Sequence, residues 1–268
     1  MIIFPNAKIN LGLNILNRRD DGYHNIETVL YPVKVKDALE IIESDQLLFS
    51  SSGLPIPGSA AENLCLKAWN LIARDLDVPK VHIHLHKQIP IGAGLGGGSA
   101  DAAFCIRLLN EKFRLGLSIE LMEDYSRQLG SDCAFFIKNQ PVLATGKGDE
   151  FQPVHINLDQ YFIVLAMPPV HVSTANADRG VRPVPEGADS LVDLESRPVE
   201  EWRDFLENGF EDAVFESYPV IKDLKDTLYQ EGALYASMSG SGASVYGIFK
   251  NEIKLPELEQ GNVVFYGV

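Results

Sequence analysis

Alternating hydrophobic and polar residues predict several β-strands in the first half of the chain. Strand-like patterns run through residues 8–16 and 26–35, and then through the shorter segments 38–42 and 47–49. The turn-forming segment Arg19-Asp20-Asp21-Gly22 separates the first two strands. Because the four strands follow one another over short connections, we expect them to pair as an antiparallel meander.

Segments whose apolar residues have the spacing of an α-helix follow these strands in the chain. Residues 63–76 are apolar at positions 64, 68, 71, 72 and 76, the spacing of one helix face. A further strand is expected at residues 81–86, where hydrophobic residues alternate strictly with histidines. Two more helices are predicted at residues 99–113 and 118–129, after a cluster of glycines.

A second group of elements follows the turn Gly146-Lys147-Gly148-Asp149. Strands are predicted at 161–167, 233–238 and 244–249, and helices at 200–206 and 220–230. Residues 181–198 contain several prolines and acidic residues without a period, which predicts a surface insertion. We place a domain boundary near residue 155, giving domains at residues 1–155 and 156–268.

The order of these elements indicates the fold class. Strands and helices alternate irregularly, with hairpins early and helices later, which favours an α+β fold over a doubly wound parallel sheet. The 268 residues, of which 46% are hydrophobic, suffice for one large domain or two modest domains, each with its own core.

Charge excludes some partners. The 37 acidic and 23 basic residues give a formal charge of −14, which repels nucleic-acid phosphates and anionic membranes. We therefore expect neither a nucleic-acid nor a membrane partner. A small anionic ligand stays possible, because a few N–H groups or cations can be focused at one site.

The cysteines and the N-terminus favour a cytoplasmic location. Cys65, Cys105 and Cys133 are widely spaced and form no C-x-x-C pair, which fits a reducing compartment. The N-terminus lacks a basic region followed by a sustained apolar stretch, and the longest apolar run, residues 161–170, contains two prolines. We expect neither a signal peptide nor a membrane span.

A glycine-rich segment lies between a predicted strand and a predicted helix. Five glycines fall within seven positions of Gly92-Ala93-Gly94-Leu95-Gly96-Gly97-Gly98. Glycine lets the backbone approach a ligand closely, and the free N–H groups of a helix N-terminus bind phosphate. Ser99 suits the N-cap of the helix and can place a hydroxyl on a metal-bound phosphate. The segment predicts a phosphate loop; a ligand-free connection is the alternative.

Two common phosphate loops do not fit this segment. The Walker A loop ends in Gly-Lys-Ser or Gly-Lys-Thr, and neither triplet occurs in the chain. The Rossmann pattern is matched by Gly92, Gly94 and Gly97, but Glu111, about twenty positions on, ends a predicted helix rather than a strand. We interpret the Rossmann match as accidental.

Three segments carry a resemblance to a known family. The loop from Pro90 to Ser99 resembles the phosphate loop of the GHMP kinase superfamily, and Met238-Ser239-Gly240-Ser241-Gly242-Ala243 resembles its C-terminal glycine motif. Residues 5–11, followed by Arg19 and Gly22-Tyr23-His24, resemble the opening signature of superfamily members that act on diphosphocytidyl-methylerythritol. The resemblance covers residues 5 to about 250.

The resemblance implies a two-domain α+β GHMP kinase fold. Its N-terminal domain would be like domain 2 of ribosomal protein S5, and its C-terminal domain would be ferredoxin-like. The implied reaction is the ATP-dependent phosphorylation, with Mg²⁺, of the 2-hydroxyl of 4-diphosphocytidyl-2-C-methyl-D-erythritol, in the non-mevalonate isoprenoid pathway. The chain departs from the family at Ser131, Cys133 and Ala134, at Ala100, and in a shortened C-terminus.

Lys8 and Asp132 are the expected catalytic residues. Asp132 falls where the family keeps its catalytic aspartate. Lys8 lies within an apolar strand pattern, which suggests a cation held in a cleft to orient Asp132 and stabilise the transferring group. Asn10 shares the face of Lys8 and is expected to bind the acceptor. The alternatives are an exposed strand lysine and an aspartate that caps a helix or turn.

The remaining site residues follow from the same match. Tyr23 and His24 are expected to stack on and hydrogen-bond a cytosine, and Thr174 to face the acceptor; ordinary hairpin aromatics are the alternative. Asn63 and Lys87 are expected to border the adenosine. The other cofactor-binding residues are expected to be Gly92, Gly94, Leu95, Gly96, Gly97, Gly98, Ser99, Gly240, Ser241 and Gly242. Ser99 is also the candidate protein ligand of Mg²⁺.

Several alternatives stay open. His82, His84 and His86 lie on one strand face with a spacing that can hold a metal, but we favour a solvated strand face because no carboxylate or cysteine completes the set locally. A related kinase acting on mevalonate or a sugar is disfavoured by Tyr23-His24. A nucleotide sensor without activity is disfavoured by the presence of Lys8 and Asp132. The expected oligomeric state is a monomer or a weak homodimer.

Overall fold

The computed structural model describes residues 1–268 except 21, 23, 174–176, 178–180, 182 and 185–189. The chain forms two compact units, each assembled from separate segments. One unit contains Met1–Ala7, Val35–Ile91 and Gly96–Gln140, and the other contains Lys8–Lys34, Gly92–Leu95 and Pro141–Val268. This is not the contiguous division at residue 155 that we expected, and that domain boundary stays a prediction.

The first unit is built on a four-stranded sheet in the order β1-β4-β6-β5. Its strands are β1 (Ile2–Ile3), β4 (Ala38–Glu43), β5 (Leu48–Gly53) and β6 (Val81–Lys87). β4 is antiparallel to β1 and β6, whereas β5 runs parallel to β6. The expected meander is therefore wrong, because β5 pairs with β6 rather than with β4. β4 and β6 are the two inner strands, and the alternate residues Val81, Ile83 and Leu85 of β6 are all buried.

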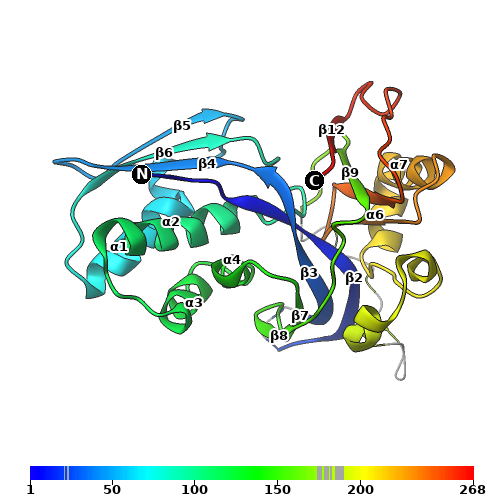
Figure 1. Ribbon diagram of the computed structural model, residues 1–268, viewed down its shortest axis with the longest axis horizontal. Helices are drawn as coiled ribbons and strands as arrows, with labels where there is room; N and C mark the ends of the chain where they lie inside the picture. The colour runs from blue at the N-terminus through cyan, green and yellow to red at the C-terminus, as the bar shows by residue number, and fades with distance from the viewer. Residues whose placement is uncertain (21, 23, 174–176, 178–180, 182, 185–189) are drawn as a thin grey trace. The chain divides into compact units, whose positions relative to one another are not determined.

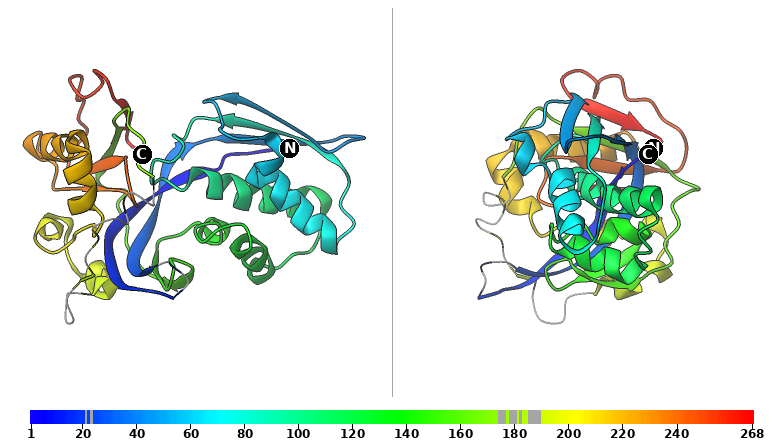
Figure 2. Two further views of the ribbon diagram at one scale, coloured as in Figure 1. Left: turned by 180° about the vertical axis from the view of Figure 1, so that it is seen from behind. Right: turned by 90° about the vertical axis from the view of Figure 1, so that its left-hand side faces the viewer.

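Helices cover one face of this sheet. They are α1 (Leu64–Asp75), α2 (Gly97–Phe113), α3 (Ile119–Arg127) and α4 (Phe135–Lys138), with the short 3₁₀ helix η1 (Ala60–Glu62) before α1. In Figure 1 and Figure 2, α2 lies between the sheet and the helices α3 and α4, and it contacts all three. The predicted helices are confirmed, and their buried residues include Ala68 and Ile72 of the expected apolar face.

The second unit contains two antiparallel sheets. One has the order β2-β3-β7-β8, with β2 (Asn6–Arg18), β3 (His24–Lys36), β7 (Val142–Thr145) and β8 (Glu150–Pro153). The other has the order β10-β11-β9-β12, with β9 (Phe162–Met167), β10 (Tyr235–Met238), β11 (Val245–Phe249) and β12 (Val263–Tyr266). Helices α6 (Glu211–Ser217) and α7 (Pro219–Gln230) accompany the second sheet, and α7 contacts β10 and β11.

Part of the expected surface insertion is instead core. The 3₁₀ helix η2 (Leu191–Ser196) lies in this region, and its Leu191 and Leu194 are buried. The helix expected at residues 200–206 is a second 3₁₀ helix, η3 (Val199–Asp204). A Cβ on Gly12 of β2 would lie 2.8 Å from a methyl of Leu206 and 3.1 Å from one of Leu191. The bare backbone of Gly12 therefore makes room for these leucines. No helix in the described ranges is long and apolar enough to cross a membrane.

Candidate active site

Lys8 and Asn10 lie on the same face of β2, and each is only 4% exposed. The Lys8 Nζ donates a hydrogen bond to Asn10 Oδ1 at 2.6 Å, and Asn10 Nδ2 donates to Thr28 Oγ1 on β3 at 3.0 Å. The Thr28 hydroxyl in turn donates to the carbonyl of Gly12 at 2.6 Å. The alternative of an exposed strand lysine is therefore wrong, because a buried hydrogen-bonded chain holds this cation.

The glycine motif between β10 and β11 contacts the middle of the glycine loop. The Ser239 hydroxyl donates to the carbonyl of Gly94 at 2.9 Å and also lies 3.4 Å from Asn10 Oδ1. Gly94 has φ +77°, and a Cβ there would lie 1.9 Å from the carbonyl oxygen of Ser239. Only glycine fits at position 94, because any side chain would collide with backbone that cannot yield.

Backbone hydrogen bonds complete this contact. The amide of Lys8 donates to the carbonyl of Leu95 at 3.0 Å, and the amide of Ser244 donates to the carbonyl of Ala93 at 3.2 Å. The Leu95 side chain is buried, so only its backbone is available to a nucleotide. The second unit thus brings Lys8, Asn10, the loop segment 92–95 and the glycine motif together.

The remaining loop residues begin α2. Gly96 is the N-cap with φ +67°, and the helix starts at Gly97. The expectation that Ser99 is the N-cap is wrong, because the N-cap adopts a left-handed conformation that favours glycine over serine. Ser99 is the third residue of the helix. The N–H groups of this first turn have no intrahelical acceptor and can bind an anion.

Asp132 lies in the turn before α4, in the same compact unit as this helix N-terminus. The next residue, Cys133, is buried, and its thiol hydrogen-bonds the Ser99 side chain. Burial raises the pKa of Cys133 to about 11, a rise that Ser99 opposes and the charge of Asp132 reinforces. The buried contact links the expected catalytic carboxylate to the first turn of α2, a link that chain positions 99 and 133 do not reveal.

Asn63 is the N-cap of α1, where its Oδ1 accepts a hydrogen bond from the amide of Cys65 at 2.9 Å. The same residue lines a cavity of about 190 Å³ in the first unit, together with the apolar Phe49, Ile56 and Ala60, with Gly58 and with three serines at positions 50, 51 and 59. An aromatic and an aliphatic side chain beside hydroxyl groups and an amide can accept a purine ring. The role of Asn63 beside the adenosine stays a prediction, and this cavity supports it.

Lys87 lies in a buried ion cluster that the sequence did not reveal. Its Nζ donates to Asp37 Oδ2 at 2.5 Å and to Asp101 Oδ2 at 2.7 Å. Burial alone would lower the pKa of Lys87, but the two carboxylates outweigh it and raise the pKa. Asp101 sits among the buried alanines of α2, and a charge at that position is the one sequence signal that could have indicated the cluster.

Only some of the residues expected to bind the acceptor lie within the described residues. His24 is the first residue of β3 and is half-buried. Tyr23 and Thr174 lie outside the described residues, so their roles stay predictions. His171, which carried no sequence signal, lies against the loop: a Cβ on Gly92 would be 2.7 Å from its Cε1.

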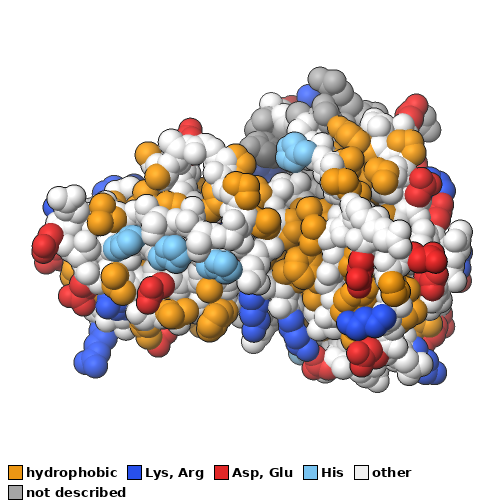
Figure 3. Space-filling view, turned by 90° about the horizontal axis from the view of Figure 1, so that it is seen from above, with side chains coloured by type: hydrophobic (Ala, Val, Ile, Leu, Met, Phe, Trp, Pro, Cys, Tyr) orange, Lys and Arg blue, Asp and Glu red, His pale blue; other side chains and the backbone are white. Residues whose placement is uncertain are grey.

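His82, His84 and His86 form a hydrogen-bonded ladder with serines of β5. Ser50 Oγ lies 2.7 Å from His82 Nε2 and 2.8 Å from His84 Nδ1, and Ser52 Oγ lies 3.0 Å from His84 Nε2 and 2.9 Å from His86 Nδ1. Figure 3 shows a row of histidines on one face. Among the residues that the structure describes, no group of three or more His, Cys, Asp or Glu side chains could hold a metal ion.

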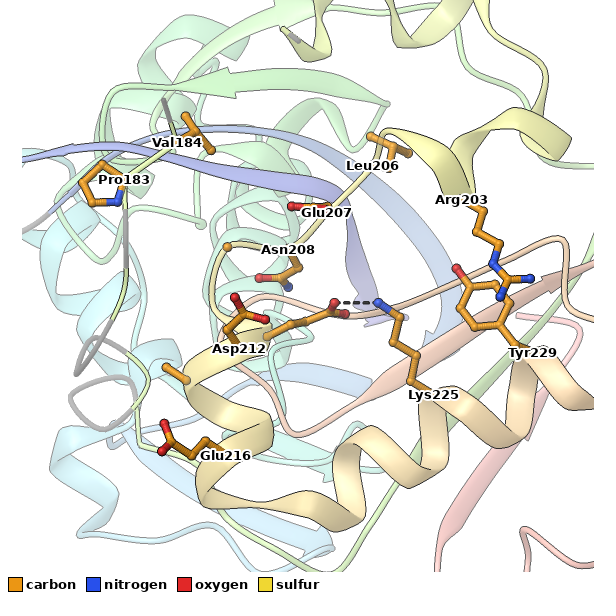
Figure 4. Close-up of a pocket in the computed structure, with 13 residues that line it drawn as sticks. Pro183, Val184, Arg203, Leu206, Glu207, Asn208, Asp212, Glu216, Lys225 and Tyr229 are labelled. Carbon is orange, nitrogen blue, oxygen red and sulfur yellow. Dashed lines mark hydrogen bonds and ion pairs between the residues drawn. The ribbon is translucent and has the colours of Figure 1, made fainter. Parts of the chain in front are cut away.

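A cavity of about 720 Å³ in the second unit contains none of the expected site residues. Figure 4 shows its wall, where Lys225 pairs with Glu211 at 2.6 Å and Arg203 lies over the ring of Tyr229. Asn208, also in this wall, donates to the carbonyls of Met238 and Gly240. One residue of the cavity wall therefore also holds the backbone of the glycine motif.

The chain is similar to known protein families and to curated proteins. Residues 63–140 match the family of GHMP kinases N terminal domains, and residues 190–261 match GHMP kinases C terminal domains. A 4-diphosphocytidyl-2-C-methyl-D-erythritol kinase of Bacteroides fragilis is 51% identical over 264 residues, 97% of this chain and 96% of that protein. One of Cytophaga hutchinsonii is 53% identical over 94% of this chain and 93% of its own length.

Solved structures of kinases are similar to this chain over nearly its whole length. A crystal structure of 4-(cytidine 5'-diphospho)-2C-methyl-D-erythritol kinase matches all of this chain and 98% of its own, with a TM-score of 0.82 and 27% identity. The mevalonate kinase of Methanococcus jannaschii matches with a TM-score of 0.73 at 14% identity, over 99% of this chain and 97% of its own. The latter likeness concerns the fold alone.

Proposed function

The chain belongs to the GHMP kinase family, and on that premise we propose that it transfers the γ-phosphoryl group of ATP to the 2-hydroxyl of 4-diphosphocytidyl-2-C-methyl-D-erythritol. The observation that carries this proposal is the 51% identity, over 97% of the chain, to a relative that bears the name of that kinase. The reaction is a step of non-mevalonate isoprenoid precursor synthesis. The α+β, two-domain GHMP kinase fold expected from the sequence is confirmed.

Lys8 and Asp132 act on the reacting groups in this proposal. Lys8, whose ammonium is held by Asn10 in a buried setting, stabilises the negative charge on the transferring phosphoryl group. Asp132 hydrogen-bonds the acceptor hydroxyl, orients it and accepts its proton. A positioned hydroxyl and a stabilised phosphoryl group are the two main requirements of phosphoryl transfer.

ATP binds along the glycine loop. The N–H groups at the start of α2 bind the phosphates, and Gly240, Ser241 and Gly242 support the loop from the neighbouring turn. The adenine occupies the cavity beside Asn63. In this proposal the backbone at Gly96 and Gly98 approaches the phosphate oxygens, whereas the missing side chains of Gly94 and Gly97 make room for Ser239 and Ile89.

Mg²⁺ is expected with the nucleotide. The Ser99 hydroxyl in the first turn of α2 is a hard oxygen donor of the kind that Mg²⁺ prefers, and phosphate oxygens and water would complete the coordination. When bound, the ion neutralises charge on the phosphates. Ser99 would hold it while keeping its contact with the Cys133 thiol, which anchors the turn that carries Asp132.

Recognition of the acceptor is assigned to the β2–β3 hairpin. Tyr23 and His24 bind the cytosine, and Asn10 and Thr174 face the sugar-like part. We further propose a cytoplasmic enzyme, a monomer or weak homodimer, without a nucleic-acid or membrane partner. The three cysteines of the chain, all within the described residues, are free and buried, as in proteins of reducing compartments.

A panel of acceptors tests the proposal. Purified protein with ATP and Mg²⁺ should phosphorylate the cytidine compound with a kcat/KM at least about a hundredfold above that for methylerythritol phosphate, mevalonate, homoserine or galactose. Equal activity on mevalonate or a free sugar would instead identify a kinase with another acceptor. Binding of ATP without transfer to any acceptor would favour a nucleotide sensor.

A further inference from the structure

A buried carboxylate holds the chain where it leads into the glycine loop. Asp37, which lies between β3 and β4, is 1% exposed. Its Oδ1 accepts hydrogen bonds from the amides of Gln88 at 2.6 Å and Ile89 at 2.8 Å. The amide of Asp37 donates to the carbonyl of Pro5 at 2.8 Å, so the carboxylate is itself anchored. The first end of the loop is thus fixed to the sheet.

A second buried carboxylate holds the helix that leaves the loop. Asp101 lies on α2, and its Oδ2 accepts a hydrogen bond of 2.7 Å from Lys87 Nζ. Lys87 is the last residue of β6 and bonds Asp37 at the same time. One ammonium therefore connects the strand before the loop, through Asp37, to the helix after it, through Asp101.

The two ends of the loop are also in direct contact. A Cβ on Gly97, the first residue of α2, would lie 2.8 Å from Ile89 Cγ2 and 3.0 Å from Lys87 Nζ. Ile89 and Gly97 are both buried. Residues 90–96 therefore span between two points that the ion cluster and this contact keep together.

The cluster is an inefficient way to stabilise a core. One ammonium and two carboxylates are at most 3% exposed, and Asp101 Oδ1 is buried without a hydrogen-bond partner. Desolvation of such charges offsets most of their mutual attraction, and apolar side chains of similar volume are often at least as stable. The cluster needs a role other than stability, and its position at both ends of the loop indicates which.

We propose that Asp37, Lys87 and Asp101 form a clamp that presets the phosphate loop for ATP, and that Lys87 acts on ATP binding through the loop rather than by touching the nucleotide. This inference rests on the proposed function and deepens it. A loop whose ends are already held loses less conformational entropy when the phosphates bind, which appears as higher affinity. The three are positioning residues.

Substitution of Asp101 separates positioning from simple stability. Asp101→Ala removes the connection to α2, whereas Asp101→Asn keeps an oxygen that can accept from Lys87. By calorimetry without acceptor, Asp101→Ala should weaken ATP binding about tenfold, and Asp101→Asn should recover to within about threefold of the unmodified protein. The KM for the acceptor should stay unchanged in both.

Two further variants separate an effect on the loop from a general loss of stability. Glu123→Ala on α3 removes another mostly buried carboxylate, one that pairs with Arg127 and Lys138, and should lower thermal stability without changing ATP affinity. The triple variant Asp37→Asn/Lys87→Met/Asp101→Leu removes all three buried charges together and keeps an oxygen at position 37 for the amides of Gln88 and Ile89, so it should fold even where Asp101→Ala does not. It should bind ATP as weakly as expected for Asp101→Ala.

Hydrogen exchange reports the clamp directly. In nucleotide-free protein, peptides covering residues 88–99 should exchange faster in the triple variant, with other peptides of the same unit unchanged. Unaltered ATP affinity in the triple variant, or acceleration spread evenly over the unit, would overturn the inference. If unmodified protein binds ATP but does not phosphorylate the cytidine compound, the proposed function is wrong, and the comparison of ATP affinities still tests the clamp. If unmodified protein does not bind ATP, both the proposed function and the clamp are wrong.

Discussion

Asn10 accepts a 2.6 Å hydrogen bond from Lys8, two residues earlier on the same face of β2. The amide of Asn10 cannot turn away, because its Nδ2 donates to Thr28 on the adjacent strand and leaves Oδ1 for the ammonium. The position of the buried cation is therefore set by a side chain whose own orientation is fixed from β3. Neither group can be altered without disturbing the other.

Asn10→Ala removes this acceptor. We expect turnover to fall about a hundredfold, because Lys8 loses one of the contacts that position it, and stability to fall by about 1–3 kcal/mol, since buried hydrogen bonds to Lys8 and Thr28 are lost. Steady-state kinetics and urea denaturation measure the two effects. Asn14→Ala, farther along β2, is the matched control and should keep its turnover. An Asn10→Ala protein with normal kcat would exclude this amide from the mechanism.

Asp132→Asn tests the proposed role of the carboxylate. The change is nearly isosteric and removes the negative charge that acts on the acceptor hydroxyl, so kcat should fall by at least about a hundredfold while ATP affinity stays within twofold or so. Calorimetry with ATP and a coupled assay provide the two values. Turnover within a few-fold of the unmodified enzyme would remove Asp132 from the chemistry. Asp124→Asn, an exposed aspartate of α3, should be neutral.

Gly94→Ala and Gly98→Ala form a matched pair within the loop. At Gly94 a Cβ would meet the carbonyl oxygen of Ser239 at 1.9 Å with φ +77°, so alanine should cost at least about 2 kcal/mol of unfolding free energy. At Gly98, inside α2, the nearest atom is a methyl of Leu64 at 3.9 Å, and alanine should be neutral or stabilise by about 0.5–1 kcal/mol. Equal stabilities of the two variants would contradict the observed contact.

His24→Ala tests recognition of the acceptor base. Loss of one base-directed hydrogen bond should lower kcat/KM for the cytidine substrate roughly tenfold to a hundredfold, because remote binding positions the reacting hydroxyl. ATP affinity should barely change. His86→Ala, in the histidine ladder of β6, provides the control. An equal loss for a truncated acceptor without cytidine would show that His24 does not read the base.

The cysteines should be inert in the native protein. Burial raises the pKa of Cys133 to about 11, and a hydrogen bond with Cys105 together with burial raises that of Cys65 well above its ordinary value. A thiol with such a pKa is about one part in a thousand thiolate at pH 8, and the thiolate is the reactive form. Mass spectrometry after iodoacetamide should show no alkylation at pH 8 in native protein and three modified cysteines in urea. Rapid modification of Cys133 without urea would show that its turn opens.

Most of the strands and helices were predictable from the sequence, whereas their pairing was predictable only for the neighbours β2 and β3. Residues 8–16 and 26–35 showed the alternation of β2 and β3, and the apolar stripe of α1 was visible in the positions of Ala68 and Ile72. β5 was also expected as a strand, but a strand's own residues do not say which neighbour it hydrogen-bonds. Its partner β6 comes from a segment about thirty residues further on.

For the candidate site, the sequence indicated individual residues and which of them share one face of a strand. The two-residue period placed Lys8 and Asn10 together, and the density of glycines indicated a backbone that approaches a ligand. The links from Asn10 to Ser239, from Ser99 to Cys133 and from Lys87 to Asp37 and Asp101 join residues that lie far apart in the chain. Such contacts form only when the chain packs, because burial forces each polar group to find a partner among whatever groups the fold brings within reach.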